Sequence, residues 1–171
     1  FYRDLWLFIY FCNGINVADL INLKFSDIQN GEISFIREKT KDRTRDTKRI
    51  YAPITPEMQS IIEKWGNNPR KSIYIFPFMK AGDDAWEHEK KKKNLTKHIN
   101  DRMKVIGEKL NIGKITAYVA RHTYATVLRN EGVPVSIISP MLGHTSVTTT
   151  EIYLADLESE NRAGNASLLS F

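Results

Sequence analysis

Four side chains that lie far apart in the sequence have the combined chemistry needed to transfer a phosphoryl group without a metal ion: Lys39, Arg121, His144 and Tyr153. A phenol, with a pKa of about 10, can attack phosphorus when cations and hydrogen-bond donors surround it. The guanidinium fork stabilises the oxygens of a pentacoordinate phosphate, and a lysine beside other cations can protonate the departing oxygen. A tyrosine on its own is more often a core aromatic, so this interpretation of Tyr153 depends on the other three residues.

Motifs typical of other chemistries are absent from the sequence. The four histidines form no paired ligand motif such as HExxH, and the single cysteine excludes an internal disulfide and a multi-cysteine metal site. The sequence contains no glycine-rich phosphate loop and no GxSxG motif. We therefore expect no metal and no cofactor, and the single cysteine favours a reducing, cytoplasmic setting.

The elements that must position these residues are predicted to be mainly helices with one small antiparallel sheet, an α+β fold. Asn30-Gly31 is typical of a tight hairpin turn, followed by a strand that continues to about Lys39 and by another at 49–54. Thr55-Pro56 and Thr116 are typical of helix starts. The expected helices cover residues 2–13, 56–65, 91–110, 117–130, 135–142 and 146–155.

Positive charge is concentrated in two segments of a chain whose net charge is +5. Residues 37–49 contain seven basic and three acidic side chains, and residues 90–93 are four consecutive lysines. Such segments favour a polyanionic partner, although a lysine run is equally typical of a solvated helix face. The apolar segment 5–12 is too short to cross a bilayer, so we expect no membrane association.

Four stretches of sequence contain the candidate residues: GINVADLINLKFSDI (14–28), REKT (37–40), ITAYVARHTYATVLRNEGV (115–133) and LGHTSVTTTEIYLA (142–155). Together they resemble the C-terminal catalytic domain of the tyrosine recombinase, or phage integrase, family, which includes the integrases of conjugative transposons. The stretches occur in the family's order and cover most of the chain. Each alone is a weak signal, whereas the four together are highly specific.

The resemblance implies a role for each candidate residue. Tyr153 would be the nucleophile that forms a 3′-phosphotyrosyl bond with DNA, and Arg121 would grip the scissile phosphate. Lys39 would protonate the 5′-oxygen, and His144 would donate a hydrogen bond to a phosphate oxygen. Because the tyrosyl–phosphate linkage retains the energy of the broken bond, such an enzyme needs neither ATP nor a metal.

Two positions depart from the family's pattern. Asn16 stands where the first motif has an arginine, and its alternative role is to cap a short helix. Tyr118 stands where the second motif has a histidine, and its phenol can donate to phosphate but is no acid or base near neutral pH. Side chains two residues apart on a strand point to the same face. If the strand after Asn30-Gly31 extends as far as Lys39, then Arg37 lies on the same face as Lys39. Arg37 is therefore expected to supply part of the missing charge. Other basic residues of this segment are expected to contact DNA phosphates: Lys41, Arg43 and Arg45.

The resemblance implies a site-specific DNA recombinase that acts on double-stranded DNA in the bacterial cytoplasm. Residues 1–155 would be the catalytic domain, an N-terminal DNA-binding arm domain would lie outside this sequence, and residues 156–171 would dock on a neighbouring protomer. We expect a homo-tetramer on DNA and a monomer in isolation. Two alternatives remain open: a DNA-binding relative with weakened catalysis, and a type IB topoisomerase-like enzyme, against which the short C-terminal tail argues.

Overall fold

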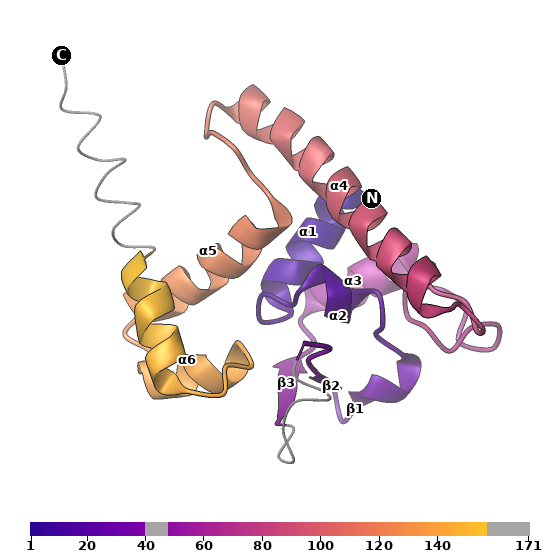
Figure 1. Cartoon of the computed structure of the whole chain (residues 1–171), viewed down its shortest axis with the longest axis horizontal. Coiled ribbons are helices and arrows are strands. Elements are labelled where there is room, and N and C mark those ends of the chain that lie inside the picture. Colours follow the sequence, from indigo (N-terminus) through magenta and orange to yellow (C-terminus); the bar gives the residue numbers. More distant parts are fainter. Residues whose placement is uncertain (40–47, 157–171) are drawn as a thin grey trace.

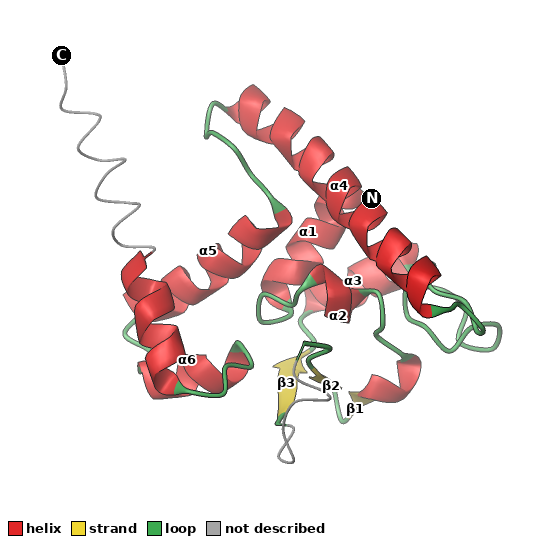
Figure 2. Ribbon diagram, viewed as in Figure 1, coloured by secondary structure: helices red, strands yellow, loops and turns green. Residues whose placement is uncertain are grey.

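The computed structural model describes residues 1–39 and 48–156, which form mainly helices beside a small sheet (Figures 1 and 2). This confirms the α+β class expected from the sequence. The helices are α1 (Tyr2–Phe11), α2 (Val17–Leu20), α3 (Pro56–Trp65), α4 (Ala85–Leu110), α5 (Ala117–Asn130) and α6 (Val135–Met141), followed by a helix at 147–156. In the described part of the chain, no helix combines the length and apolarity needed to cross a membrane.

The sheet has the order β1-β2-β3 and is antiparallel throughout, with β1 (Ile28–Gln29), β2 (Glu32–Ile36) and β3 (Arg49–Pro53). A short 3-10 turn, η1 (Phe25–Asp27), leads into it. The predicted hairpin turn is confirmed, because Asn30 and Gly31 have φ of 52° and 78°, the left-handed values that a two-residue turn requires. Ile33 faces Ala52 in the register, and both side chains are fully buried.

The strand after this turn is shorter than predicted. It ends at Ile36, so the expectation that it continues to about Lys39 is wrong. The physical reason is a contact with a distant residue: the backbone N–H of Glu38 donates to Oδ1 of Asp19 at 2.7 Å instead of pairing with a strand. Lys39 therefore lies in a turn rather than on the sheet.

Helix starts agree with the capping residues in the sequence. Thr55 and Thr116 accept hydrogen bonds from the backbone of α3 and α5, as predicted. The start of α4 is six residues earlier than predicted, because Asp84 caps it by accepting from Glu87 N–H at 2.8 Å. The first turns of α4 were not predicted as helix because they are polar. The buried apolar residues whose spacing indicates a helix begin only at Leu95.

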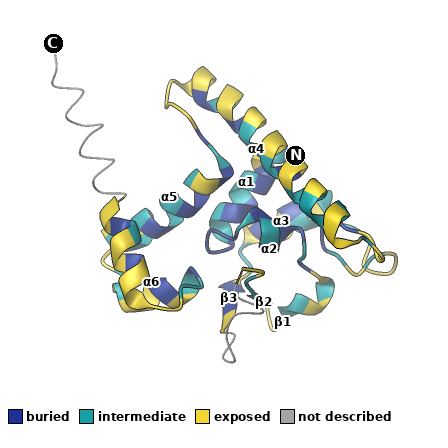
Figure 3. Cartoon of the chain, viewed as in Figure 1, coloured by how far each residue is buried: buried dark blue, intermediate teal, exposed yellow. Residues whose placement is uncertain are grey.

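Apolar side chains form two clusters of different size. The larger one surrounds α1, whose Leu5, Phe8 and Ile9 are fully buried, and includes residues of the sheet, α3 and α4 (Figure 3). The smaller one joins α5, α6 and the helix 147–156. Its buried members are Ala125, Ile138, Leu142 and Leu154. Helix α5 contributes to both clusters and so connects them.

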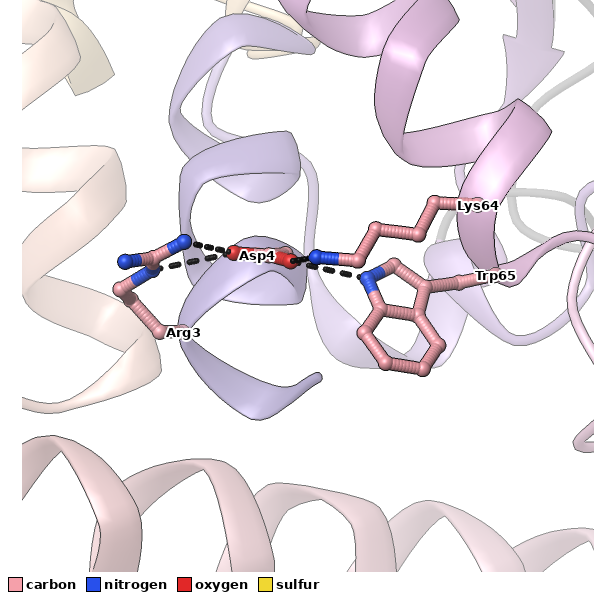
Figure 4. Close-up of polar contacts among 4 residues, drawn as sticks. All are labelled: Arg3, Asp4, Lys64 and Trp65. Carbon is pink, nitrogen blue, oxygen red and sulfur yellow. Dashed lines mark hydrogen bonds and ion pairs between the residues drawn. The ribbon is translucent and has the colours of Figure 1, made fainter.

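A buried carboxylate fixes α1 to α3 (Figure 4). Asp4, with its side chain 8% exposed, accepts from Trp65 Nε1 at 2.8 Å, from Lys64 Nζ at 3.2 Å and from Arg3 Nε at 3.0 Å. Burial alone would raise the pKa of Asp4, but the hydrogen bonds from Trp65, Arg3 and Lys64 outweigh it and hold this pKa well below its usual range. Asp4 is therefore ionised wherever the chain is folded near neutral pH.

Candidate active site

A cleft of about 1120 Å³ brings together all six residues expected to act. Its walls come from α2, the segment after β2, α4, α5, the segment after α6 and the helix 147–156. Segments more than a hundred residues apart in the sequence therefore meet at one surface. The expected residues that line it are Arg37, Lys39, Tyr118, Arg121, His144 and Tyr153.

Arg121 is the most buried cation of this group, at 5% exposure. Its Nη1 donates to the carbonyl of Gly14 at 2.9 Å, and its Nη2 donates to the carbonyl of Leu142. Burial, and after it the positive charge of Arg37, lowers the pKa of Arg121 to about 10, so the guanidinium is still charged at neutral pH. Two backbone carbonyls thus hold a desolvated positive charge at the floor of the cleft.

His144 lies against this guanidinium. Its Nε2 is 3.3 Å from Arg121 Nη2, and its Nδ1 is 2.8 Å from the hydroxyl of Thr150, which is fully buried. Burial and the charges of Arg121, Arg37 and Lys39 lower the pKa of His144 to about 4. The imidazole is therefore neutral at pH 7, and because arginine can only donate, we assign Nε2 as the acceptor.

Tyr153 is half-buried and its ring is surrounded by other rings. The ring of His144 lies edge-on to it at 5.8 Å, and the ring of His122 is stacked on it at 5.2 Å. Burial, and then the nearby phenol of Tyr118, raises the pKa of Tyr153 above its usual value. The phenol is thus protonated at neutral pH and must lose its proton if it is to attack phosphorus.

Arg37 and Lys39 line the cleft although no strand joins them. Arg37 Nη1 donates to the carbonyl of Gly143 at 3.1 Å, and Gly143 is held at φ 65°. A Cβ added to Gly143 would lie 2.5 Å from Cδ of Arg37, so a glycine is required for this close approach. Asp19, whose carboxylate accepts from the backbone N–H of Glu38 between Arg37 and Lys39, is itself buried. Burial raises the pKa of Asp19, and the hydrogen bond from Glu38 N–H and the charge of Arg37 offset this rise only in part.

The two positions that depart from the family's pattern also line the cleft. Asn16 occupies the N-cap position of α2 as predicted, but its side chain accepts no capping hydrogen bond. Tyr118 is 54% exposed, so its phenol is accessible from solvent. The neutral amide of Asn16 thus faces the same space as the charged Arg37 and Arg121.

Some lining residues were not predicted to belong to the site. Three lysines of α4 face the cleft, namely Lys92, Lys93 and Lys97. The sequence shows the lysine run at 90–93, but it does not show which of these lysines lie on the side of α4 that faces the cleft. Asp19, which also lines the cleft, and Thr150, which contacts His144 from outside the lining, were not predicted to belong to the site either.

Two groups of predicted residues lie outside the described part of the chain. These are the proposed phosphate contacts Lys41, Arg43 and Arg45, and nearly all of the proposed docking segment 156–171. Among the residues that the structure does describe, no group of three or more His, Cys, Asp or Glu side chains could hold a metal ion.

Comparison with known proteins shows the family to which the chain belongs. The chain belongs to the phage integrase family, whose sequence profile matches residues 3–160. It is 30% identical over 154 residues to tyrosine recombinase XerA of Pyrococcus furiosus, which covers 88% of this chain and 49% of that protein. It is 28% identical over 153 residues to tyrosine recombinase XerC of Caldanaerobacter subterraneus subsp. tengcongensis, covering 88% and 40%. The chain thus spans about half the length of the curated relatives it matches.

Solved structures show the same fold. A crystal structure of XerA recombinase matches with a TM-score of 0.60 and 23% identity, covering 99% of this chain and 58% of that one. A post-cleavage complex of XerH recombinase with palindromic difH substrate matches with a TM-score of 0.61 and 18% identity, covering 98% and 45%. The shared architecture is that of the tyrosine recombinase catalytic domain.

Proposed function

We propose that this chain is the catalytic domain of a site-specific DNA recombinase that cuts and rejoins strands through a 3′-phosphotyrosyl intermediate. The observation that carries the proposal is the position of Tyr153 in one cleft with four other predicted residues: Arg37, Lys39, Arg121 and His144. A phenol that shares a cleft with a buried guanidinium, charged at neutral pH, suits attack on a phosphodiester once the phenol has lost its proton.

In the cutting step, Oη of Tyr153 forms a bond to phosphorus while the bond from phosphorus to the 5′-oxygen breaks. When the phosphate takes over the hydrogen bond that Arg121 Nη2 makes to His144, Nε2 of the neutral imidazole is released to accept the phenol proton, and the 5′-oxygen takes a proton from Lys39. The protonated His144 can then donate to a phosphate oxygen, the role that the resemblance implies. Attack by a 5′-hydroxyl on the phosphotyrosine reverses the step, so the reaction consumes no ATP and needs no metal.

Arg37 is proposed to supply the charge that Asn16 lacks. Its guanidinium lies near enough to Arg121 to lower the pKa of that residue, and the carbonyl of Gly143 holds it at the cleft. Two guanidiniums can neutralise the equatorial oxygens of a phosphate better than one.

Double-stranded DNA is the proposed partner, bound by a homo-tetramer during strand exchange. The lysines of α4 extend the positive surface of the cleft beyond the reacting group, as a polyphosphate backbone requires. Among the structural relatives, XerH is described as bound to difH substrate and lambda integrase as a dimer bound to a core site.

Covalent trapping tests the proposal. The protein is mixed with a pool of nicked duplexes of randomised sequence, from which the cleaved fragment diffuses away, and DNA that remains attached under denaturing conditions is recovered. We expect a covalent complex with the wild-type chain and none with Tyr153→Phe, while both bind DNA equally in a fluorescence anisotropy titration.

Because Asn16 stands where the family's first motif has an arginine, the same experiment also tests a second function, that of a DNA-binding relative that does not cleave. DNA binding by the wild-type chain without any covalent complex would support that function and reject the recombinase. Relaxation of a supercoiled plasmid by the isolated monomer, without strand exchange, would instead support a topoisomerase.

A further inference from the structure

His122 stands behind the reactive tyrosine rather than in the cleft. It follows Arg121 on α5, and its ring is stacked on that of Tyr153 with a centroid separation of 5.2 Å and an interplanar angle of 12°. It is not among the residues that line the cleft. A phosphate in the cleft would therefore meet Tyr153 but not His122.

The stack is part of a longer row of rings. Tyr118, one helical turn before His122 on α5, lies edge-on to it at 4.0 Å and 82°. His144 lies edge-on to Tyr153, at 81°. The phenol ring is thus contacted by a parallel ring, His122, and an edge-on ring, Tyr118, from α5, and by the edge-on ring of His144. Both geometries are favoured for aromatic pairs.

The phenol needs such support because of the helix that carries it. The helix 147–156 joins the rest of the chain through the smaller apolar cluster, in which Leu154 is its buried side chain. Helix α5, in contrast, also packs in the larger cluster through Ala117 and Ala120. His122 therefore connects the ring of Tyr153 to the better-anchored element.

We propose that His122 is a positioning residue that holds the phenol of Tyr153 in the orientation from which it attacks phosphorus. The inference rests on the proposed function, since it assigns a role in the same reaction. In this role His122 acts through the stack rather than through a contact with DNA. Its loss lets the ring rotate about its side-chain bonds, so a smaller fraction of molecules presents the oxygen correctly.

The rate of covalent-complex formation, measured in a single turnover with DNA at saturating concentration, distinguishes positioning of the phenol from an effect on DNA binding. With His122→Ala we expect the rate of covalent-complex formation to fall roughly 10- to 100-fold, the scale of a small misplacement of a reacting group. The dissociation constant for DNA should change less than about twofold, because His122 is outside the cleft. With His122→Phe, which keeps a planar ring, the rate should return to within about threefold of the wild type.

The chain offers a matched control. His98 on α4 is stacked on Tyr2 with a centroid separation of 5.5 Å and an angle of 25°, outside the cleft. His98→Ala should leave the trapping rate unchanged. If His122→Ala does not fold, His122→Leu replaces it, because leucine fills the space without a planar ring and should trap more slowly than His122→Phe.

Each outcome decides a separate question. Absence of trapping with the wild type rejects the proposed function itself. Wild-type trapping with an unchanged rate in His122→Ala, or equal rates in His122→Phe and His122→Leu, rejects the positioning role and leaves the recombinase intact.

Discussion

At the scale of single residues, Arg37 places a second guanidinium in a cleft where Asn16 offers an amide and the family's pattern has an arginine. Arg37→Ala is expected to lower the rate of covalent-complex formation roughly 100-fold, the usual effect of removing one preorganised donor to developing charge. Arg37→Lys keeps the charge but not the fork, so it should recover part of the rate. Single-turnover trapping measures both.

Arg49 provides the control for this comparison. It lies on β3, where its Nη2 donates to Ser34 at a distance of 2.9 Å. Arg49 is not among the residues that line the cleft. Arg49→Ala should cleave at the wild-type rate. A wild-type rate in Arg37→Ala would exclude Arg37 from the reaction.

His144 gives the folded chain a specific pH dependence. Its pKa is about 4 in the folded state and near 6.5 when unfolded, so the unfolded chain binds the extra proton between these values. The stability that neutral His144 contributes is therefore present above about pH 6.5 and is lost as the pH falls towards 4. The free energy of unfolding in urea should fall between pH 7 and pH 4.5, and it should fall less in His144→Gln. Identical losses in the two proteins would contradict the assignment.

Motif order and residue type were enough to predict that Tyr153, Arg121 and His144 belong to one site. Residues that act through contacts between distant segments could not be predicted. Asp19 fixes the segment of Lys39 by accepting from a backbone N–H nineteen residues further along the chain. His122 was part of a quoted motif, but its stack on Tyr153 depends on how α5 meets the helix 147–156.

At the scale of elements, α4 divides its lysine run between two tasks. Lys91 pairs with Asp83 at 2.6 Å, and Lys90 lies over the ring of Trp86 at 4.5 Å, so these two stabilise the start of the helix. Lys92 and Lys93 face the cleft while also pairing with Glu89, and Lys97, outside the run, faces it one turn later. The sequence could not predict this division, because it depends on the helix starting after Asp84.

The division predicts which lysines contribute to DNA affinity. Lys93→Ala and Lys97→Ala should each weaken binding and lower the slope of log K against log salt by about 1, the expected loss for one phosphate contact. Lys104→Ala, on the same helix but outside the cleft, should leave the slope unchanged. Anisotropy titrations between low and moderate salt give the slopes, and an equal change in all three variants would reject a specific α4 surface.

The contact between α1 and α3 gives a prediction about stability. Asp4→Ala leaves the indole N–H of Trp65 without its acceptor and should lower the free energy of unfolding by about 1–3 kcal/mol. Lys64→Ala should cost less than about 1 kcal/mol, because this lysine is 58% exposed and water replaces its partner. Chemical denaturation measures both values, and an equal effect would show that the ion pair rather than the indole contact matters.

Local signals predicted elements well where the determinants are neighbours in the sequence. The Asn30-Gly31 turn and the caps at Thr55 and Thr116 are such cases. The predicted end of β2 was wrong because it is set by Asp19, and the predicted start of α4 was wrong because its first turns lack buried apolar residues.

At the scale of the whole molecule, two apolar clusters of unequal size meet along α5. The helix 147–156 and α6 depend on the smaller cluster, whereas α1 lies within the larger one. Local opening requires less free energy where fewer apolar groups are buried. Hydrogen–deuterium exchange should therefore be faster in α6 and in the helix 147–156 than in α1. Equal protection of all three would mean that the two clusters unfold as one unit.

The carbonyls that hold Arg121 belong to opposite sides of this boundary. Gly14 follows α1 in the larger cluster, and Leu142 is a buried member of the smaller one. A molecule whose smaller cluster has come away loses one of the two carbonyls that anchor the Arg121 guanidinium, and with it the position of the Tyr153 ring. In the proposed reaction, a copy whose folding is incomplete would therefore not cleave DNA, because its candidate reacting groups are aligned only once both clusters have formed.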